Sequence, residues 1–462
     1  MRLLHYSDIE NAHDDPERIG RLAGVISSLN DDDAVVCGTG DNVAPGVLPL
    51  VTRGEVALEF FDAVKPDVST FGNHDFDFGA NHTRRIVARS PQEWVSANIY
   101  DGRERFAGVS PWTVREIGSE RVGFIGVTDP TTPAANPSAK ALAFTEPVAA
   151  VTAAIDDLND VGVDHVVVLS HLGRDDERLA GACDVDVILG GHVHSERIER
   201  IDGTVLTRPG NGGAVLFEID LDDGDVTRHV VDDGALDASL TARYRRQRAD
   251  AELDTVVGHV ETPIRRTERE AFRGESRVGN FVADAYRWAA ERDVGDVPVV
   301  GLQNSGGIRT GPPLSGDVTV FDLVSLVPFD EPLVVVELSG AELLAVFREA
   351  TDTTRFGEAD WWHAHVSGAR VVYDYADDEL VDASIADGTV AEPSASFSQV
   401  RERGQYLVAT TEFLLHTADE FPTITEQRRI RTLDVQYEIL ADYARERGIE
   451  AELDGRVVRT GL

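Results

Sequence analysis

The sequence predicts a two-domain protein, with an α/β domain in its first half and a separate domain in its second half. The chain has 462 residues, which is more than one ordinary domain contains. Its first half alternates short apolar runs with amphipathic helical patterns, an alternation typical of α/β folds. A charged stretch with few apolar residues then separates this half from a new series of helix and strand patterns.

Short apolar runs in the first half have the length and composition of buried strands. They cover residues 3–4, 34–37, 68–71, 124–127, 165–169 and 185–189. Amphipathic patterns predict helices over residues 16–29 and 55–64. Sites in α/β sheets form beyond the carboxyl ends of strands. Most of these runs are followed within a few residues by Asp, Asn or His, so we expect a site there.

The charged stretch over residues 237–260 predicts a helix with sparse apolar positions, which we interpret as a connector. We therefore expect a first domain over residues 1–230, a linker helix over 231–262 and a second domain over 263–462. The patterns in the second domain predict a helix over 280–291 and strands over 297–302, 333–338 and 371–375.

Acidic residues outnumber basic residues by 82 to 43, which gives a net charge of −39. This charge repels nucleic-acid polymers and anionic membranes, so we expect neither as a partner. Lys65 and Lys140 are the only lysines. A folded, acidic, lysine-poor chain is typical of the high-salt cytosol of a halophile, where screening relieves the self-repulsion.

The chain begins with MRLLHYSDIE, which lacks the charged and long apolar segments of a signal peptide. No stretch of about 18 uncharged apolar residues is present that would span a membrane. We therefore expect a cytoplasmic protein. Its two cysteines, Cys37 and Cys183, are too few for a disulfide framework or a CxxC metal site.

Metal-binding residue types follow the predicted strands one after another. In chain order they lie in Asp8-Ile9-Glu10, Gly40-Asp41-Asn42, Gly72-Asn73-His74-Asp75, Ser170-His171 and Gly190-Gly191-His192-Val193-His194. Each motif alone is weak, because a lone GDN or GN is usually a turn and a lone HxH is usually a surface or core pair. Together they predict a site for two divalent cations, with Asp41 as the natural bridging carboxylate. Imidazole, carboxylate and amide ligands suit Mn, Zn, Fe or Co.

The order DxE, GDN, GNHD, SH and GGHVH resembles the calcineurin-like metallophosphoesterases, and the string GNHDFDFG followed by SANI is similar to their 5'-nucleotidase branch. The resemblance implies a four-layer α/β/β/α catalytic domain in which two metal ions activate a hydroxide that attacks phosphorus. One ion would be held by Asp8, Glu10, Asp41 and His194, and the other by Asp41, Asn73, His171 and His192. His74 would stabilise charge on the substrate phosphate, oriented by Asp77.

Glu10 departs from this pattern, because the family usually has a histidine at that position. Two interpretations remain open: Glu10 ligates the metal, or it misses the metal and leaves the site weak. We favour ligation. A harder, anionic oxygen donor would shift the preference towards Mn or Mg, so we expect Mn above Zn, Fe or Co.

The second half contains Asn304-Ser305-Gly306-Gly307-Ile308-Arg309, a glycine-rich turn whose backbone N–H groups and arginine suit an anion. Alone this is a weak signal, since a hairpin loop has a similar composition. Together with the strings at 275–285, 327–343 and 366–374, it resembles the α+β substrate-binding domain of the 5'-nucleotidases. In that family the matching residues Arg273, Asn304 and Arg309 hold the ribose and phosphate side of a nucleotide.

The resemblance also implies that two aromatic residues, Phe329 and Phe413, clamp the base by stacking. For either residue alone, packing in the core is the alternative. The family usually has a Gly-Gly-Asp-Gly turn after the second aromatic residue; here Asp419 is retained but the glycines are absent. We therefore expect a turn of different shape and an altered base pocket.

These observations predict a 5'-nucleotidase that releases a nucleoside and phosphate. An alternative within the family is an enzyme that acts on cyclic nucleotides, nucleotide sugars or dinucleotides. A further alternative is a non-catalytic nucleotide-binding protein, which the departure at Glu10 would suit.

The charge of −39 predicts that the melting temperature and the activity rise as KCl increases from low concentration into the molar range. Screening weakens repulsion between exposed acidic groups, whereas buried pairs are affected much less. Thermal melts in a KCl series measure this. A melting temperature that stays flat across the series would contradict the expectation.

Overall fold

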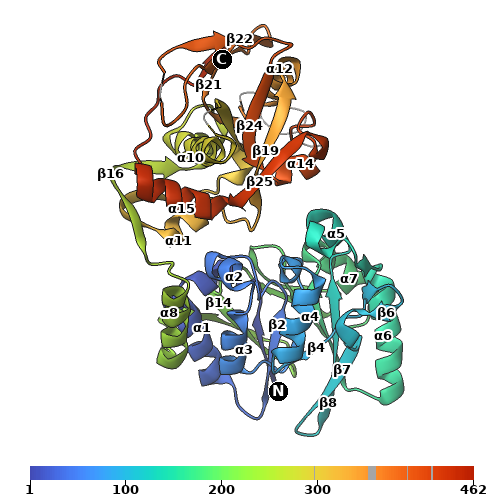
Figure 1. Ribbon diagram of the computed structural model, residues 1–462. Helices are drawn as coiled ribbons and strands as arrows, with labels where there is room; N and C mark the ends of the chain where they lie inside the picture. Colours follow the sequence, from blue (N-terminus) through green and yellow to red (C-terminus); the bar gives the residue numbers. More distant parts are fainter. Residues whose placement is uncertain (296, 352–360, 393, 418–419) are drawn as a thin grey trace. The chain divides into compact units, whose positions relative to one another are not determined.

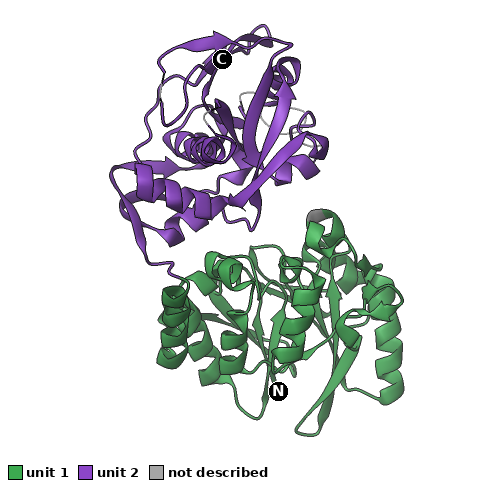
Figure 2. Ribbon diagram, in the orientation of Figure 1, with its two compact units in different colours: residues 1–251 green, residues 252–462 purple. Residues whose placement is uncertain are grey.

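The computed structural model describes residues 1–295, 297–351, 361–392, 394–417 and 420–462. The chain divides into two compact units, residues 1–251 and 252–462 (Figure 2).

The first unit contains two six-stranded sheets (Figure 1). The first sheet has the order β15-β14-β1-β2-β3-β4, formed by β1 (Arg2–Tyr6), β2 (Ala34–Thr39), β3 (Val68–Thr70), β4 (Glu93–Trp94), β14 (Val215–Asp220) and β15 (Val226–Val230). The second has the order β12-β13-β11-β10-β8-β7, formed by β7 (Trp112–Ile117), β8 (Glu120–Thr128), β10 (His165–His171), β11 (Val187–Gly190), β12 (Glu196–Ile201) and β13 (Thr204–Pro209).

The two sheets pack face to face around one buried core. Leu3, Val35 and Val68 from the first sheet share this core with Phe124 and Val167 from the second. Another core lies on the outer face of the second sheet, beneath helices α6 (Pro147–Val161) and α7 (Asp176–Ala182). Helices α1 (Pro16–Leu29) and α3 (Ala57–Val64) flank the first sheet. The predicted four-layer α/β/β/α fold is thus confirmed.

The strands that carry the predicted site run parallel within each sheet. β1, β2 and β3 are parallel neighbours in the first sheet, and β8, β10 and β11 are parallel neighbours in the second. Their carboxyl ends therefore meet at one edge of each sheet. Because the two sheets are stacked, polar residues that follow these strands converge there although they are far apart in sequence.

The range of the predicted linker helix, 231–262, contains two elements in the structure. Helix α8 (Ala238–Asp250) is shorter, and residues from Val256 onward form a strand, β16 (Val256–Arg266), paired with β18 (Gly311–Thr319). Tyr244 of α8 is fully buried, stacks on His13 and has its hydroxyl 2.8 Å from His13 Nδ1. This packing makes α8 part of the first unit. The sequence did not indicate this packing, because the helix has few apolar residues.

The second unit is built on the five-stranded sheet β20-β17-β24-β19-β25, whose strands are β17 (Val299–Asn304), β19 (Pro332–Ser339), β20 (Ala364–Ser367), β24 (Gln405–Thr411) and β25 (Arg429–Val435). Residues alternate between its two faces: Val299 and Val335 join one core, whereas Val300 and Val334 join another. The first core includes residues of α10 (Arg277–Val294), α11 (Val320–Leu326) and α15 (Gln436–Arg447). The second core includes residues of α12 (Gly340–Glu349), β21 (Ala369–Asp374) and β22 (Glu379–Ala386). This is the α+β arrangement that was predicted.

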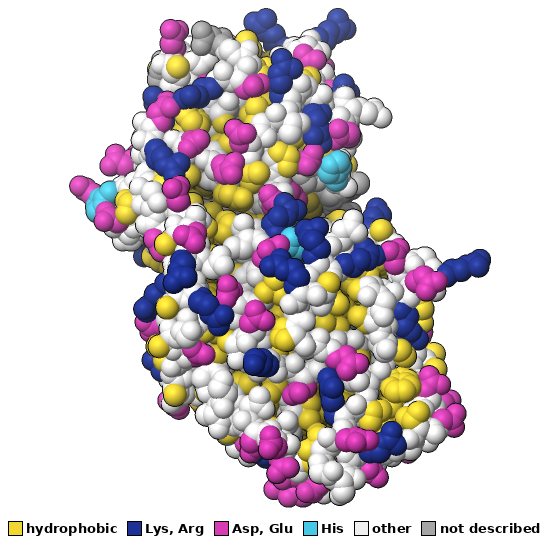
Figure 3. Space-filling view, turned by 60° about the horizontal axis from the view of Figure 1, so that its bottom comes forward, with side chains coloured by type: hydrophobic (Ala, Val, Ile, Leu, Met, Phe, Trp, Pro, Cys, Tyr) yellow, Lys and Arg dark blue, Asp and Glu magenta, His cyan; other side chains and the backbone are white. Residues whose placement is uncertain are grey.

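Charged side chains of both signs lie interspersed on the face shown in Figure 3. Several arginines form surface ion pairs, for example Arg197 with Glu177 at 2.7 Å and Arg228 with Glu196 at 2.6 Å. None of the described helices combines the length and the hydrophobicity that crossing a membrane would require.

Candidate active site

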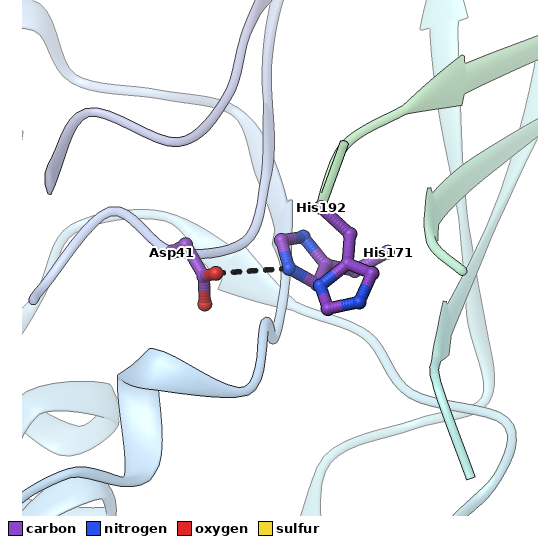
Figure 4. A group of neighbouring side chains, drawn as sticks. All are labelled: Asp41, His171 and His192. Atoms are coloured by element: carbon purple, nitrogen blue, oxygen red, sulfur yellow. Dashed lines mark hydrogen bonds and ion pairs between the residues drawn. The ribbon is translucent and has the colours of Figure 1, made fainter. Parts of the chain in front are cut away.

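Two clusters of potential metal ligands lie at the carboxyl ends of the parallel strands in the first unit. One consists of Asp41, His171 and His192, and the other of Asp8, Glu10 and His194. Within each cluster the potential ligand atoms all lie within 4.8 Å of one another. Figure 4 shows His171 and His192 converging from one side on Asp41, which lies opposite them. The structure therefore brings together six residues that the sequence predicted as ligands.

His171 faces Asp41 in a geometry that requires positive charge between them. Its Nδ1–H donates to the carbonyl oxygen of Thr39 at 2.7 Å, which directs Nε2 towards Asp41 Oδ2 at 3.0 Å. Burial lowers the pKa of His171, but the Asp41 carboxylate outweighs this and raises it to about 10. A cation between imidazole nitrogen and carboxylate oxygen satisfies both atoms, so the pair fits a metal ion.

Asn73 supplies a buried oxygen without a partner. Its Oδ1 is inaccessible and accepts no hydrogen bond from any residue that the structure describes. An unpaired buried amide oxygen costs free energy unless a donor or a cation occupies its position. An amide oxygen is also a suitable ligand for a divalent cation. Asn73 therefore fits the role of a further ligand beside Asp41.

Glu10 turns into the other cluster and is only 3% exposed. Its Oε1 lies 3.0 Å from His194 Nε2, and the same nitrogen is 4.0 Å from Asp8 Oδ1. Burial raises the pKa of Asp8 to about 7, even though the nearby His171 acts in the opposite direction. Carboxylates buried this closely repel one another without a cation, so the geometry fits Glu10 as a ligand and disfavours the interpretation that it misses the site.

The backbone is strained at four of these positions. Asp8, Glu10, Asp41 and His192 have φ values of 49°, 48°, 51° and 73°, in the left-handed region that residues other than glycine rarely adopt. Such strain persists only where surrounding contacts enforce it, and it concentrates at functional sites. One such contact is between the backbone N–H of His192 and Asp8 Oδ1, at 3.1 Å.

Asp75 joins the loops that follow β2 and β3, a role that the sequence reasoning missed. Its carboxylate accepts backbone N–H groups from Gly72 at 2.7 Å and from Asp41, Asn42 and Val43 at 3.1 Å each. The loops approach so closely that a Cβ at Gly72 would lie 2.1 Å from Asp41 Oδ1. Asp75 thereby holds Asp41 beside the Asn73 loop.

His74 and Asp77 form the predicted pair. The Nδ1 of His74 lies 3.0 Å from Asp77 Oδ2, and its backbone N–H donates to Asp41 Oδ1 at 2.7 Å. Burial lowers the pKa of His74, but the hydrogen bond to Asp77 and the charge of Asp41 raise it to about 9. This shift favours the protonated form of the ring, whose side chain is 39% exposed.

In the second unit, several predicted binding residues lie at one edge of the central sheet. Asn304 ends β17, which is parallel to β24, and Phe413 follows β24 as the first residue of the short helix α14 (Phe413–His416). Leu333 of β19 pairs with Thr411 of the antiparallel β24, so Phe329 and Phe413 flank the same sheet edge.

These binding residues differ in exposure. Phe413 is 39% exposed, whereas Phe329 is partly buried and packs against a core cluster. Arg273 and Arg309 are exposed. Gly306 and Gly307 lie in the turn after Asn304, where a Cβ at Gly307 would be 1.9 Å from Gln303 Nε2. Asp419 lies outside the described residues.

Glu420 is a neighbour of Asn304 that the sequence reasoning did not identify. The Asn304 Nδ2 donates to Glu420 Oε2 at 2.7 Å. Glu420 directly follows Asp419 in the sequence. An acidic residue next to this predicted binding residue was therefore the feature that could have identified Glu420 as a neighbour of Asn304.

Residues 1–196 match the calcineurin-like phosphoesterase family, and residues 256–426 match the 5'-nucleotidase C-terminal domain. The chain thus combines a calcineurin-like phosphoesterase domain with a 5'-nucleotidase C-terminal domain. These two matches confirm the resemblance that the sequence predicted for each half of the chain.

Among its relatives is the trifunctional nucleotide phosphoesterase protein YfkN of Bacillus subtilis, 21% identical over 99% of this chain and 35% of that protein. The chain thus spans about a third of the length of that relative. A 5'-nucleotidase of Diplobatis ommata is 22% identical over 93% of this chain and 82% of that protein. The crystal structure of a 5'-nucleotidase precursor from Thermus thermophilus has a TM-score of 0.70 at 24% identity, covering 100% of this chain and 99% of that one.

Replacing Glu10 by alanine should lower the bound metal from two ions per chain to one, because the cluster of Asp8, Glu10 and His194 loses a buried carboxylate ligand. Mass spectrometry of the metal content after dialysis against Mn²⁺ measures this. Asp77→Ala is the control, since Asp77 contacts His74 and is not a proposed ligand, and it should retain two ions. Glu10→Ala with two ions at undiminished affinity would show that Glu10 is not a ligand.

Proposed function

We propose that the chain hydrolyses the phosphate ester of a nucleotide, as a 5'-nucleotidase-type enzyme with two divalent metal ions. The observation that carries the proposal is the pair of ligand clusters around Asp41, next to the His74–Asp77 pair. Its nucleotide specificity is supported by the second unit, whose family is the 5'-nucleotidase C-terminal domain.

Asp8, Glu10, Asp41 and His194 would hold one metal ion, and Asp41, Asn73, His171 and His192 would hold the other. The Asp41 carboxylate would bridge them. The bound ions would supply charge neutralisation for the phosphate and a lowered pKa for an attacking water molecule. An oxygen donor at position 10 favours Mn²⁺ in this ligand set.

His74 acts on the substrate phosphate in this proposal. Its Nδ1 is engaged by Asp77, so the ring is held with Nε2–H free to donate to a phosphoryl oxygen. Side-chain exposure of 39% leaves the ring accessible to substrate. Negative charge develops on the phosphoryl oxygens between His74 and the ligand clusters during the reaction. The hydrogen bond from His74 Nε2–H therefore stabilises the transition state more than the bound substrate.

The reaction is a hydrolysis. The oxygen of a water molecule forms a bond to phosphorus as the bond between phosphorus and the ester oxygen breaks. The ester oxygen takes up a proton and leaves as the alcohol of the nucleoside, and inorganic phosphate is the other product. In-line attack requires the water and the leaving oxygen on opposite sides of phosphorus, so positioning governs the rate.

Recognition of the nucleoside falls to the second unit. Phe413 is exposed beside the end of β24 and would stack on a base, which any base permits through its π-face. Phe329 would complete the clamp from the neighbouring strand end. Arg273, Asn304 and Arg309 would bind the ribose and phosphate side, with the turn at Gly306 and Gly307 adding backbone N–H groups.

A broader phosphoester specificity is the second candidate. The residues after Phe413 form the helix α14 and lack the glycine-rich turn usual in the family, so the base pocket has a different boundary. The name of the relative YfkN, a trifunctional nucleotide phosphoesterase, also favours more than one nucleotide substrate. Cyclic nucleotides, nucleotide sugars and dinucleotides therefore belong in the substrate panel. A non-catalytic binding protein would have no need of the His74–Asp77 pair.

Replacing Phe413 by alanine should raise KM for a nucleoside monophosphate by about ten-fold or more, because base stacking on an aromatic side chain contributes about 1–3 kcal/mol. Hydrolysis of p-nitrophenyl phosphate at saturation should change little, since it has no base to stack. Ile430→Ala is the matched control, because Ile430 has the same 39% exposure on the edge strand β25.

Phosphate release with Mn²⁺ and the substrate panel measures both the activity and these effects. Equal losses on both substrates would show that Phe413 has no role in base binding. No release from any phosphoester by the native chain would overturn the proposed function.

A further inference from the structure

The side chain of Asn136 makes hydrogen bonds with all of its polar groups. Its Nδ2 donates to the backbone carbonyl of Asn73 at 2.8 Å and to Asp77 Oδ1 at 2.8 Å. Its Oδ1 accepts the backbone N–H of Ser138 at 2.9 Å. The residue is 8% exposed, so these bonds are largely shielded from water.

This pattern fixes the orientation of the amide. The carbonyl of Asn73 and the carboxylate of Asp77 accept hydrogen bonds only, so the NH₂ group must face them. The Ser138 N–H is a donor and requires the oxygen. Turning the amide over would place oxygen against two acceptors and NH₂ against a donor, at the cost of three bonds.

Asn136 is itself held firmly by its own segment. It lies between helix α5 (Thr132–Ala135) and the single turn Pro137–Ala139, and its backbone N–H donates to Thr132 O at 2.8 Å. Its backbone carbonyl accepts the N–H of Ala139 at 3.0 Å. The amide is therefore a rigid anchor for whatever it contacts.

The two acceptors of Asn136 lie at the two ends of the loop that carries His74. Asn73 precedes His74, and Asp77 follows it and contacts its Nδ1. The amide of Asn136 thus connects the backbone of Asn73, a proposed ligand, to the carboxylate of Asp77, which orients the ring of His74. Oδ2 of Asp77 contacts only His74 in this group of residues. Oδ1 accepts the hydrogen bond from Asn136 and also lies 3.2 Å from His74 Nδ1.

We propose that Asn136 is a positioning residue, which fixes the Asp77 carboxylate, and through it His74, in the orientation needed for phosphoester hydrolysis. Without the amide, the carboxylate would rotate about its side-chain torsions and the loop would lose the bond that closes it. The inference rests on the proposed function, because His74 has this role only if the chain is a phosphoesterase.

The test compares kcat and KM on p-nitrophenyl phosphate for Asn136→Asp and Asn136→Ser, with metal content and melting temperature measured in parallel. Both variants keep an oxygen near Ser138 N–H but lose the two N–H donors. Partners of this kind typically contribute about 10–100-fold to activity, so kcat should fall within that range with KM changed less than about three-fold. Ser138→Ala is the control: its hydroxyl donates to the backbone carbonyl of Asp77 at 3.2 Å, and kcat should change less than about two-fold.

A double-mutant cycle separates positioning from general stability. If Asn136 acts through Asp77, then Asn136→Ser introduced into the Asp77→Ala chain should lower kcat by less than about two-fold, since the group it positions is gone. A further loss as large as in the native chain would overturn the inference, and so would a native kcat in both Asn136 variants. If one of the two Asn136 variants fails to fold, the kcat of the other variant tests the inference. An inactive native chain would instead overturn the proposed function, so the two failures are distinguishable.

Discussion

The mutual repulsion of three buried carboxylates is the constraint on which the rest of the site depends. Asp8, Glu10 and Asp41 lie within a few residues of two strand ends and are almost inaccessible to water. Burial alone disfavours their charged forms, and their proximity adds to the cost. Cations between them would remove this cost, and the ring nitrogen of His171 and the amide oxygen of Asn73 would complete the proposed ligand sets. Two features of the fold keep these carboxylates close together. One is the strained backbone at Asp8, Glu10 and Asp41, and the other is Asp75, whose carboxylate accepts four backbone N–H groups.

The stacking of the two sheets brings residues from distant segments of the chain into this site. Asp41 comes from the first sheet, whereas His171 and His192 come from the second, and a shared apolar core fixes the distance between the sheets. The glycine at position 72 permits the closest approach. Rigid packing of this kind suits catalysis, because a preorganised site needs little rearrangement as charge develops in the transition state.

The sequence was most informative where chemistry coincides with strand ends. The residue types and the order of the motifs are local features, so the sequence alone could predict the six residues that form the two clusters of the first unit. Asp75 was missed because its partners are backbone N–H groups, which have no sequence signature. Asn136 was missed because its partners Asn73 and Asp77 are 63 and 59 residues away in the sequence. The packing of helix α8 was also not visible in the sequence, because Tyr244 is its one aromatic residue and the partner His13 is distant in sequence. In the second unit, the sequence could not distinguish the exposed Phe413 from the partly buried Phe329.

The central claim is that two metal ions share the Asp41 carboxylate. Crystals grown with Mn²⁺, with anomalous diffraction measured at the manganese absorption edge, test it directly. The account predicts two anomalous peaks about 3.5–4 Å apart, both in contact with Asp41 and one of them in contact with Glu10. A single peak, or two peaks of which only one contacts Asp41, would contradict it.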